Sequence, residues 1–199
     1  MSKTLENELK LLIDKETYTY ILNHSQNIKK PLKQINYYFD TENRCLEKQD
    51  STLRIRHENN RWLLCLKLKN IEQSRYTVSS IEIEQEITEQ IFKQCRHLPS
   101  KISCWLPPDA QRLLGNLINK LQFLGFIENT RYSINFLDNY AFDLDHTTFP
   151  GGLESFELEV EGIESQDESL DILNSLTNKG INFHLNKKSK YKRFLEILS

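Results

Sequence analysis

Charged side chains recur at every second position in several segments of the sequence. Glu6, Glu8 and Lys10 do so near the N-terminus, and Arg54 and Arg56 do so later. Because successive side chains of a β-strand point to opposite faces, each segment would present its charges on one face. Carboxylates bind hard divalent cations, and arginine suits phosphate oxygens. Together these residue types fit a polyphosphate that carries Mg²⁺ or Mn²⁺.

A polar strand face usually turns to bulk water, and for any single segment a solvated face is the commoner arrangement. Solvated faces are usually mixed, however, whereas here some segments concentrate carboxylates and others concentrate arginine and lysine. Buried carboxylates need cations, and buried cations need anions. If the apolar faces pack against helices, the charged faces line a polar interior. A ligand in that interior would supply both the cations and the anions that these side chains need. We adopt this second arrangement as the prediction.

The elements that would position these charges follow from the same alternation. It predicts eight strands, centred on residues 5–11, 35–40, 53–56, 64–69, 81–87, 131–136, 142–145 and 156–161. Helices are expected at 14–26, at 88–98 with Thr88 as N-cap, at 108–124 closing on Gly125, at 166–179 and at 187–198. A closed barrel of this size holds one small ligand and removes exposed sheet edges. The predicted fold is α+β, a closed eight-stranded antiparallel β-barrel with helices packed outside.

Composition narrows the class of protein. The 199 residues are 38% hydrophobic and 27% charged, which fits one globular domain over 1–199. A net charge of −2 gives no basic signature for nucleic acid or an anionic membrane. The N-terminus resembles no signal peptide, and no stretch is apolar enough to span a membrane, so a cytoplasmic protein is expected. The four cysteines show neither a CxxC pair nor zinc-finger spacing, so neither disulfides nor structural zinc are expected.

The order of these motifs resembles the CYTH superfamily, also called triphosphate tunnel metalloenzymes. The N-terminal ExExK strand is Glu6 to Lys10, and the YYDT-type segment includes Tyr38. The other matching elements are Leu53-Arg54-Ile55-Arg56, Leu64-Cys65-Leu66-Lys67, Leu144-Asp145, Phe156-Glu157-Leu158-Glu159-Val160-Glu161 and Lys188-Ser189-Lys190-Tyr191. The resemblance spans nearly the whole chain and is closest to small stand-alone members.

The resemblance implies a role for each matching residue. The implied metal ligands for Mg²⁺ or Mn²⁺ are Glu6, Glu8, Asp145, Glu157 and Glu159, with Glu82 and Glu84 as additional acidic residues. The implied triphosphate contacts are Lys10, Arg54, Arg56, Lys67, Arg131 and Lys190. By analogy with the thiamine triphosphatase branch, Tyr38 and Lys67 would serve the leaving group.

Several alternatives stay open at this point. Lys69 shares a face with Lys67, and Asp143 shares one with Asp145. Glu82, Glu84 and Glu86 are not ranked. Tyr38 is otherwise a wall residue, and Lys190 is otherwise a solvated charge on the last helix.

The predicted activity is metal-dependent hydrolysis of a triphosphate, with a small-molecule triphosphate as the partner. Inorganic triphosphate ranks first, because no cluster of residues looks built to grip an organic group. The alternatives are a thiamine triphosphatase, a class IV-type adenylate cyclase and a non-catalytic polyphosphate- or nucleotide-binding module.

Overall fold

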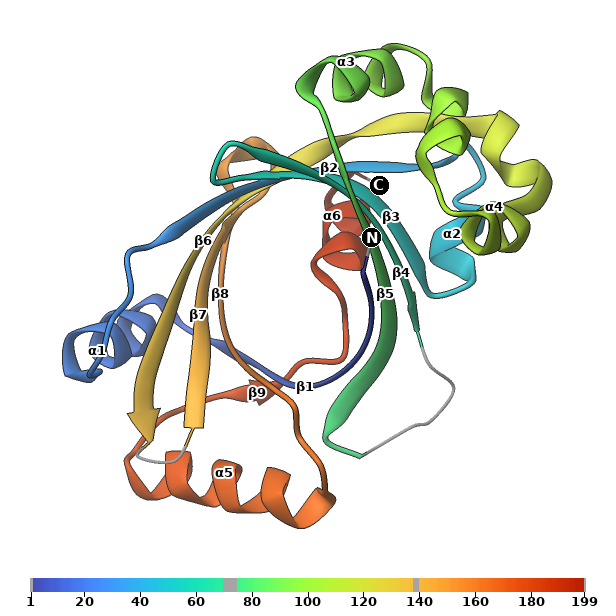
Figure 1. Ribbon diagram of the computed structural model, residues 1–199. Helices are drawn as coiled ribbons and strands as arrows, with labels where there is room; N and C mark the ends of the chain where they lie inside the picture. The colour runs from blue at the N-terminus through green and yellow to red at the C-terminus, as the bar shows by residue number, and fades with distance from the viewer. Residues whose placement is uncertain (1, 70–74, 138–139, 199) are drawn as a thin grey trace. The chain divides into compact units, whose positions relative to one another are not determined.

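A computed structural model describes residues 2–69, 75–137 and 140–198 (Figure 1). The chain forms two compact units. Unit 1 comprises Met1–Leu5, Gln34–Lys69 and Ser80–Ile127, and unit 2 comprises Glu6–Lys33, Asn70–Ser79 and Glu128–Ser199. The chain passes from one unit to the other inside several strands, so each unit is described on its own.

Most elements of unit 1 lie in the middle of the chain. They are β2 (Leu32–Thr41), α2 (Cys45–Lys48), β3 (Ser51–Glu58), β4 (Arg61–Lys69), β5 (Thr77–Ile87), α3 (Glu89–His97), the 3-10 helix η1 (Pro99–Trp105), α4 (Pro108–Leu114), the 3-10 helix η2 (Gly115–Lys120) and the first part of β6 (Leu121–Leu137).

Unit 2 combines the N-terminal region with the C-terminal third of the chain. Its elements are most of β1 (Ser2–Ile13), α1 (Lys15–His24), the second part of β6, β7 (Tyr140–Thr148), the 3-10 turn η3 (Pro150–Gly152), β8 (Glu154–Glu161), α5 (Gln166–Asn178), β9 (His184–Leu185) and α6 (Lys190–Leu198).

The hydrogen-bonded strand order is β5-β4-β3-β2-β6-β7-β8-β1-β9, and β5 also pairs with β1. The order of the eight long strands therefore closes on itself. This confirms the eight predicted strands, while the two-residue β9 was not predicted. Among the described strands, each of the eight long ones therefore pairs with a neighbour on both sides.

Local sequence explains where several elements begin and turn. Asn59 and Asn60 both have positive φ, 46° and 60°, between β3 and β4. Two such residues make the tight turn that suits a β-hairpin. As predicted, Thr88 caps α3, where its side chain accepts a hydrogen bond from the backbone N–H of Ile91 at 3.3 Å.

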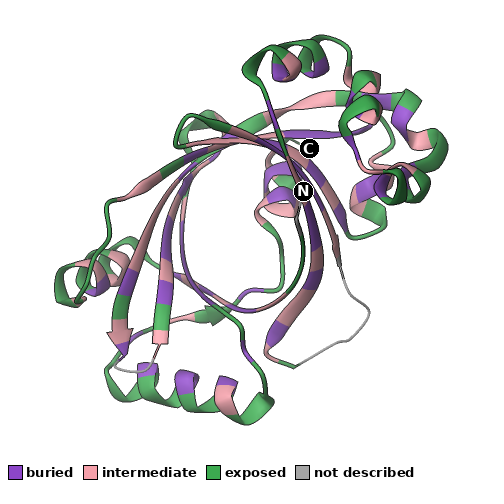
Figure 2. Ribbon diagram, in the orientation of Figure 1, coloured by how far each residue is buried: buried purple, intermediate pink, exposed green. Residues whose placement is uncertain are grey.

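The apolar strand faces pack against helices within each unit. In unit 1, Leu53, Leu64 and Ile83 pack with residues of α2, α3 and α4. In unit 2, strand residues of the same kind pack with Ile21 of α1 and Ile172 of α5. Figure 2 shows α5 turning its buried residues to one side. These contacts confirm that helices cover the apolar faces.

One helix prediction is wrong. The helix expected over 108–124 ends at Leu114, and Gly115 follows with φ of 50°. A short 3-10 segment follows, and β6 already begins at Leu121. The expected end at Gly125 therefore falls inside a strand. Leu113 is 59% exposed, while Leu114, Ile118 and Leu121 are buried.

No helix in the described ranges is both long and apolar enough to cross a membrane.

The packing of α5 gives a test of this arrangement. Ile172 is fully buried, whereas Leu170 on the same helix is 38% exposed. We expect Ile172→Ala to lower the free energy of unfolding by about 2 to 4 kcal/mol, because it leaves a cavity in the core. Leu170→Ala should change it by less than about 1 kcal/mol. Urea unfolding measures both, and equal losses would contradict this packing.

Candidate active site

Four carboxylates are buried on the polar face of the unit 2 strands. Glu8 lies on β1, Asp145 on β7, and Glu157 and Glu159 on β8, and each is at most 2% exposed. Strand pairing brings them together, because Lys10 is opposite Glu159 and Asp145 is opposite Glu157. Glu6 is half-buried on the same face of β1 as Glu8. The polar face is therefore buried, and the solvated alternative is wrong for these strands.

The ammonium group of Lys190 lies among three of these carboxylates. Its Nζ is 2.9 Å from Asp145, 2.9 Å from Glu157 and 2.8 Å from Glu159. Lys190 is the first residue of α6, and 15% of its side chain is exposed. It is therefore not a solvated charge. Lys188 of the same motif is exposed and pairs with Glu196 instead.

Arg131 and Lys10 neutralise the remaining carboxylate oxygens. The Arg131 guanidinium contacts Asp145 through Nε at 2.8 Å and through Nη2 at 2.7 Å, and Nη2 is also 2.6 Å from Glu159. Lys10 Nζ is 2.7 Å from Glu8 and 3.6 Å from Glu159. We call Glu8, Lys10, Arg131, Asp145, Glu157, Glu159 and Lys190 the carboxylate cluster.

A second layer of polar side chains orients the cluster. Asn129 donates a hydrogen bond to Asp145 Oδ1 at 3.0 Å and accepts one from the Thr147 hydroxyl at 2.8 Å. Asn186 donates to Glu157 Oε1 at 2.9 Å, and Arg193 donates to its Oε2 at 2.5 Å. These four residues were not predicted from the sequence. Arg193 lies three residues after Lys190, about one helical turn, and this spacing is the signal in the sequence that points to it.

The charged groups of the carboxylate cluster shift one another's pKa values. Burial alone would raise the pKa of Asp145, but Arg131 and Lys190 outweigh it and lower that pKa to about 2. Burial would also raise the pKa of Glu159. The positive charges of Lys10, Lys190 and Arg131 outweigh it and hold that pKa well below its ordinary value. The carboxylates in turn raise the pKa of Lys190. Asp145 and Glu159 are therefore ionised at neutral pH, and Lys190 is protonated.

Unit 1 holds a second charged group on β3, β4 and β5. Arg54 Nη2 donates to Glu82 at 2.7 Å, and Lys67 Nζ is 3.7 Å from the other oxygen of Glu82. Arg56 donates from Nε to the side-chain amide oxygen Oδ1 of Asn36 at 3.0 Å. Tyr38 is 1% exposed and is opposite Arg54 in the β2–β3 register. Strand β3 lies between Tyr38 and Lys67 in the strand order.

Two guanidinium groups retain unused donors. In the described part of the chain, Arg54 Nε and Arg193 Nε are buried without a hydrogen-bond partner. A buried donor left unpaired costs free energy, so such atoms need an explanation. A phosphate oxygen would satisfy a guanidinium donor.

Geometry distinguishes some of the open alternatives. Asp143 contacts Arg131 Nη1 at 2.7 Å and Ser133 at 2.8 Å and is partly exposed, whereas Asp145 is fully buried and also reaches Lys190. Glu82 is buried, Glu84 is half-buried and Glu86 is exposed beside Arg61. The side chain of Lys69 lies outside the described part of the structure.

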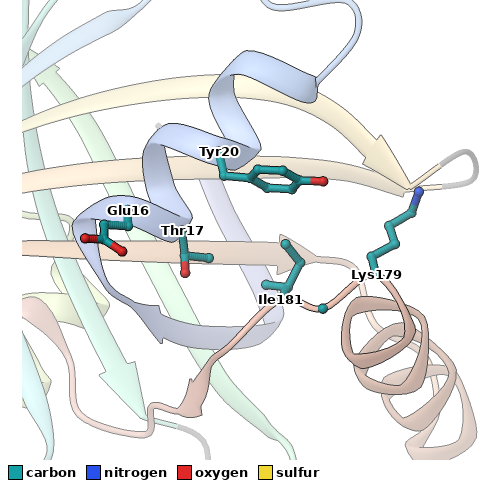
Figure 3. A pocket seen from close by; sticks show the side chains of 6 residues that line it. Glu16, Thr17, Tyr20, Lys179 and Ile181 are labelled. Atoms are coloured by element: carbon teal, nitrogen blue, oxygen red, sulfur yellow. The ribbon is translucent and has the colours of Figure 1, made fainter.

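A separate cavity of about 360 Å³ lies between α1 and the segment after α5 in unit 2. Glu16, Thr17, Tyr20, Lys179, Gly180 and Ile181 line it, and Figure 3 shows these side chains. No residue predicted for the active site lines this cavity, so it is distinct from the carboxylate cluster.

A family model described as the CYTH domain matches residues 4–195. The chain belongs to the CYTH domain family. CYTH members are metal-dependent triphosphatases or cyclases that bind triphosphate substrates. A search among curated proteins finds no match.

Solved structures share the CYTH fold. A Hippeastrum protein, described as a candidate adenylyl cyclase with a dominant triphosphatase activity, is 25% identical; the match covers 96% of this chain and 95% of that one, with a TM-score of 0.78. A candidate adenylate cyclase from Bacillus halodurans is 27% identical over 98% and 99% of the two chains, with a TM-score of 0.75. A Pyrococcus horikoshii OT3 protein is 21% identical over 96% and 99%, with a TM-score of 0.59. These matches confirm the predicted closed eight-stranded fold.

The lowered pKa of Asp145 predicts acid sensitivity. Its folded-state pKa of about 2 lies below the ordinary value of 3.8, so the unfolded chain takes up the proton first as pH falls. The stabilisation is complete above about pH 4 and is lost between about pH 4 and pH 2, and it corresponds to about 2 kcal/mol.

Urea unfolding across this pH range measures the effect. Asp145→Asn should flatten the loss between pH 4 and pH 2, although it also destabilises the protein at neutral pH by leaving cations uncompensated. Asp171→Asn, at an exposed position on α5, should keep the wild-type dependence. An Asp145→Asn protein with an unchanged acid slope would contradict the pKa assignment.

Proposed function

We propose that this protein is a metal-dependent triphosphatase that hydrolyses inorganic triphosphate. The observation that carries the proposal is the carboxylate cluster, in which four buried acidic side chains lie beside three cationic side chains. Such a cluster costs stability unless a ligand repays it. CYTH membership and the triphosphatase activity described for the Hippeastrum protein support the same conclusion.

The donor set of the cluster fits a hard divalent cation. Glu8, Asp145, Glu157 and Glu159 offer only oxygen atoms, which Mg²⁺ and Mn²⁺ prefer, and Glu6 extends the set on β1. These five residues would hold the metal. A bound divalent cation would supply charge neutralisation for the phosphates and a more acidic attacking water.

Cationic side chains would bind and orient the triphosphate. Lys10, Arg131 and Lys190 belong to the carboxylate cluster, and a metal on the carboxylates would free their donors for phosphate oxygens. The proposal also assigns Arg54, Arg56 and Lys67 to the phosphates, because Arg54 keeps a buried donor without a partner in the described part of the chain. Phosphoryl transfer is accelerated mainly by positioning and by charge stabilisation, which these residues provide.

Two further residues are assigned to the leaving group. Lys67 would place a positive charge beside it, and the buried hydroxyl of Tyr38 would donate a hydrogen bond. Glu82 and Glu84 would have accessory roles. Glu82 would orient Arg54 and Lys67.

A substrate panel tests the proposal. Inorganic triphosphate, thiamine triphosphate and ATP are each supplied with Mg²⁺ or Mn²⁺, and the products are identified. We expect orthophosphate, released fastest from inorganic triphosphate. Cyclic AMP with pyrophosphate from ATP would indicate a cyclase instead, and binding without any product would indicate a binding module.

Substitution of one metal ligand tests the site. Glu8→Gln should lower kcat by about a hundredfold or more, because it removes a charge that holds the metal. Glu161→Gln is the matched control, because Glu161 is opposite Glu8 in the β1–β8 register and its side chain is 55% exposed. Full activity of Glu8→Gln would refute the metal assignment.

A further inference from the structure

The paired strands β4 and β5 of unit 1 place a thiol beside two carboxylates. Cys65 is opposite Glu84 in the register, and Lys67 is opposite Glu82, so Cys65, Glu82 and Glu84 share one face. The Cys65 Sγ and one oxygen of each carboxylate all lie within 4.8 Å of one another. These three ligand atoms are therefore close enough to one another to hold one metal ion.

The group is enclosed. Cys65 is fully buried, Glu82 is 4% exposed and Glu84 is half-buried. Arg54 compensates the charge of Glu82 at 2.7 Å. Glu84 accepts a hydrogen bond from the neutral Cys65 thiol, whose Sγ is 3.2 Å from its Oε1. A thiol is a weak donor, so this contact compensates a carboxylate poorly.

A buried hydroxyl on the same face gives a second, independent observation. Ser80 is 2% exposed, and its Oγ has no hydrogen-bond partner in the described part of the chain. Because side chains two residues apart on a strand share a face, Ser80 points to the same side of β5 as Glu82 and Glu84. An unpaired buried hydroxyl is costly, and a water or ligand on this face of β5 would pair with it.

We propose that Cys65, Glu82 and Glu84 form a second cation site, selective for a thiophilic divalent ion such as Zn²⁺. One thiolate and two carboxylates are ligands that Zn²⁺ accepts, whereas Mg²⁺ and Mn²⁺ prefer oxygen alone. Binding forms a metal–sulfur bond and releases the thiol proton to solvent. The site differs in ligand chemistry from the carboxylate cluster, and the inference does not depend on the proposed hydrolysis.

Bound metal would compete with an existing ion pair. Glu82 holds Arg54, so a metal on Glu82 would withdraw a carboxylate from that guanidinium. The site would thereby link thiophilic metals to the position of Arg54.

Co²⁺ titration of the reduced full-length protein tests the site. Excess Mg²⁺ is present throughout to occupy oxygen-only sites. Thiolate-bound Co²⁺ gives an intense charge-transfer band in the near ultraviolet, which oxygen ligands do not give. We expect this band to saturate at one equivalent and to disappear when Zn²⁺ is added.

Two cysteine variants identify the thiol. Cys65→Ser should abolish the band, while Cys104→Ser, at an exposed cysteine of η1, should keep it. Glu84→Gln should weaken Co²⁺ binding by about tenfold or more and retain the band at saturation, which tests the site even if Cys65→Ser folds poorly. A wild-type protein without the band, or a band that survives Cys65→Ser, would overturn the proposal.

Discussion

The mutual neutralisation of buried carboxylates and buried cations is the constraint on which unit 2 depends. Lys190 reaches three carboxylates, and Arg131 reaches two of the same three. Taking such charges out of water costs several kcal/mol for each ion, which close pairing only partly returns. Helix α6 therefore does more than cover apolar surface, because its first residue supplies a charge that the strands of unit 2 require.

The strands were predictable because one simple pattern specifies them. Alternation separates Leu9 and Leu11 from Glu8 and Lys10, and pairing then decides only which neighbours meet. The helix over 108–124 was mispredicted for a related reason. Its leucines satisfy a helical period beyond Leu114, but Gly115 adopts a positive φ that ends the helix. Residues from Leu121 onward are then paired as a strand, and tertiary pairing overrides their helical spacing.

The charged members of the carboxylate cluster could be picked out from the sequence, whereas their neutral partners could not. Asp145, Glu157 and Lys190 stand in motifs whose order along the chain carries information. Asn129, Thr147 and Asn186 are ordinary polar residues in sequence, and only the fold places them against carboxylates. The proposed site of Cys65, Glu82 and Glu84 was not predicted from the sequence for the same reason. A search for closely spaced cysteine and histidine cannot find ligands contributed by two paired strands.

Our central proposal is that the charged faces of this protein bind a metal-bound triphosphate. Calorimetric titration with a triphosphate whose bridging oxygens are replaced by imido groups tests that claim without turnover. We predict saturable binding at one equivalent with Mg²⁺ present, and binding at least about tenfold weaker when Mg²⁺ is removed, because metal and ligand share the carboxylate cluster. Undetectable binding, or an affinity that is the same with and without Mg²⁺, would refute the proposal.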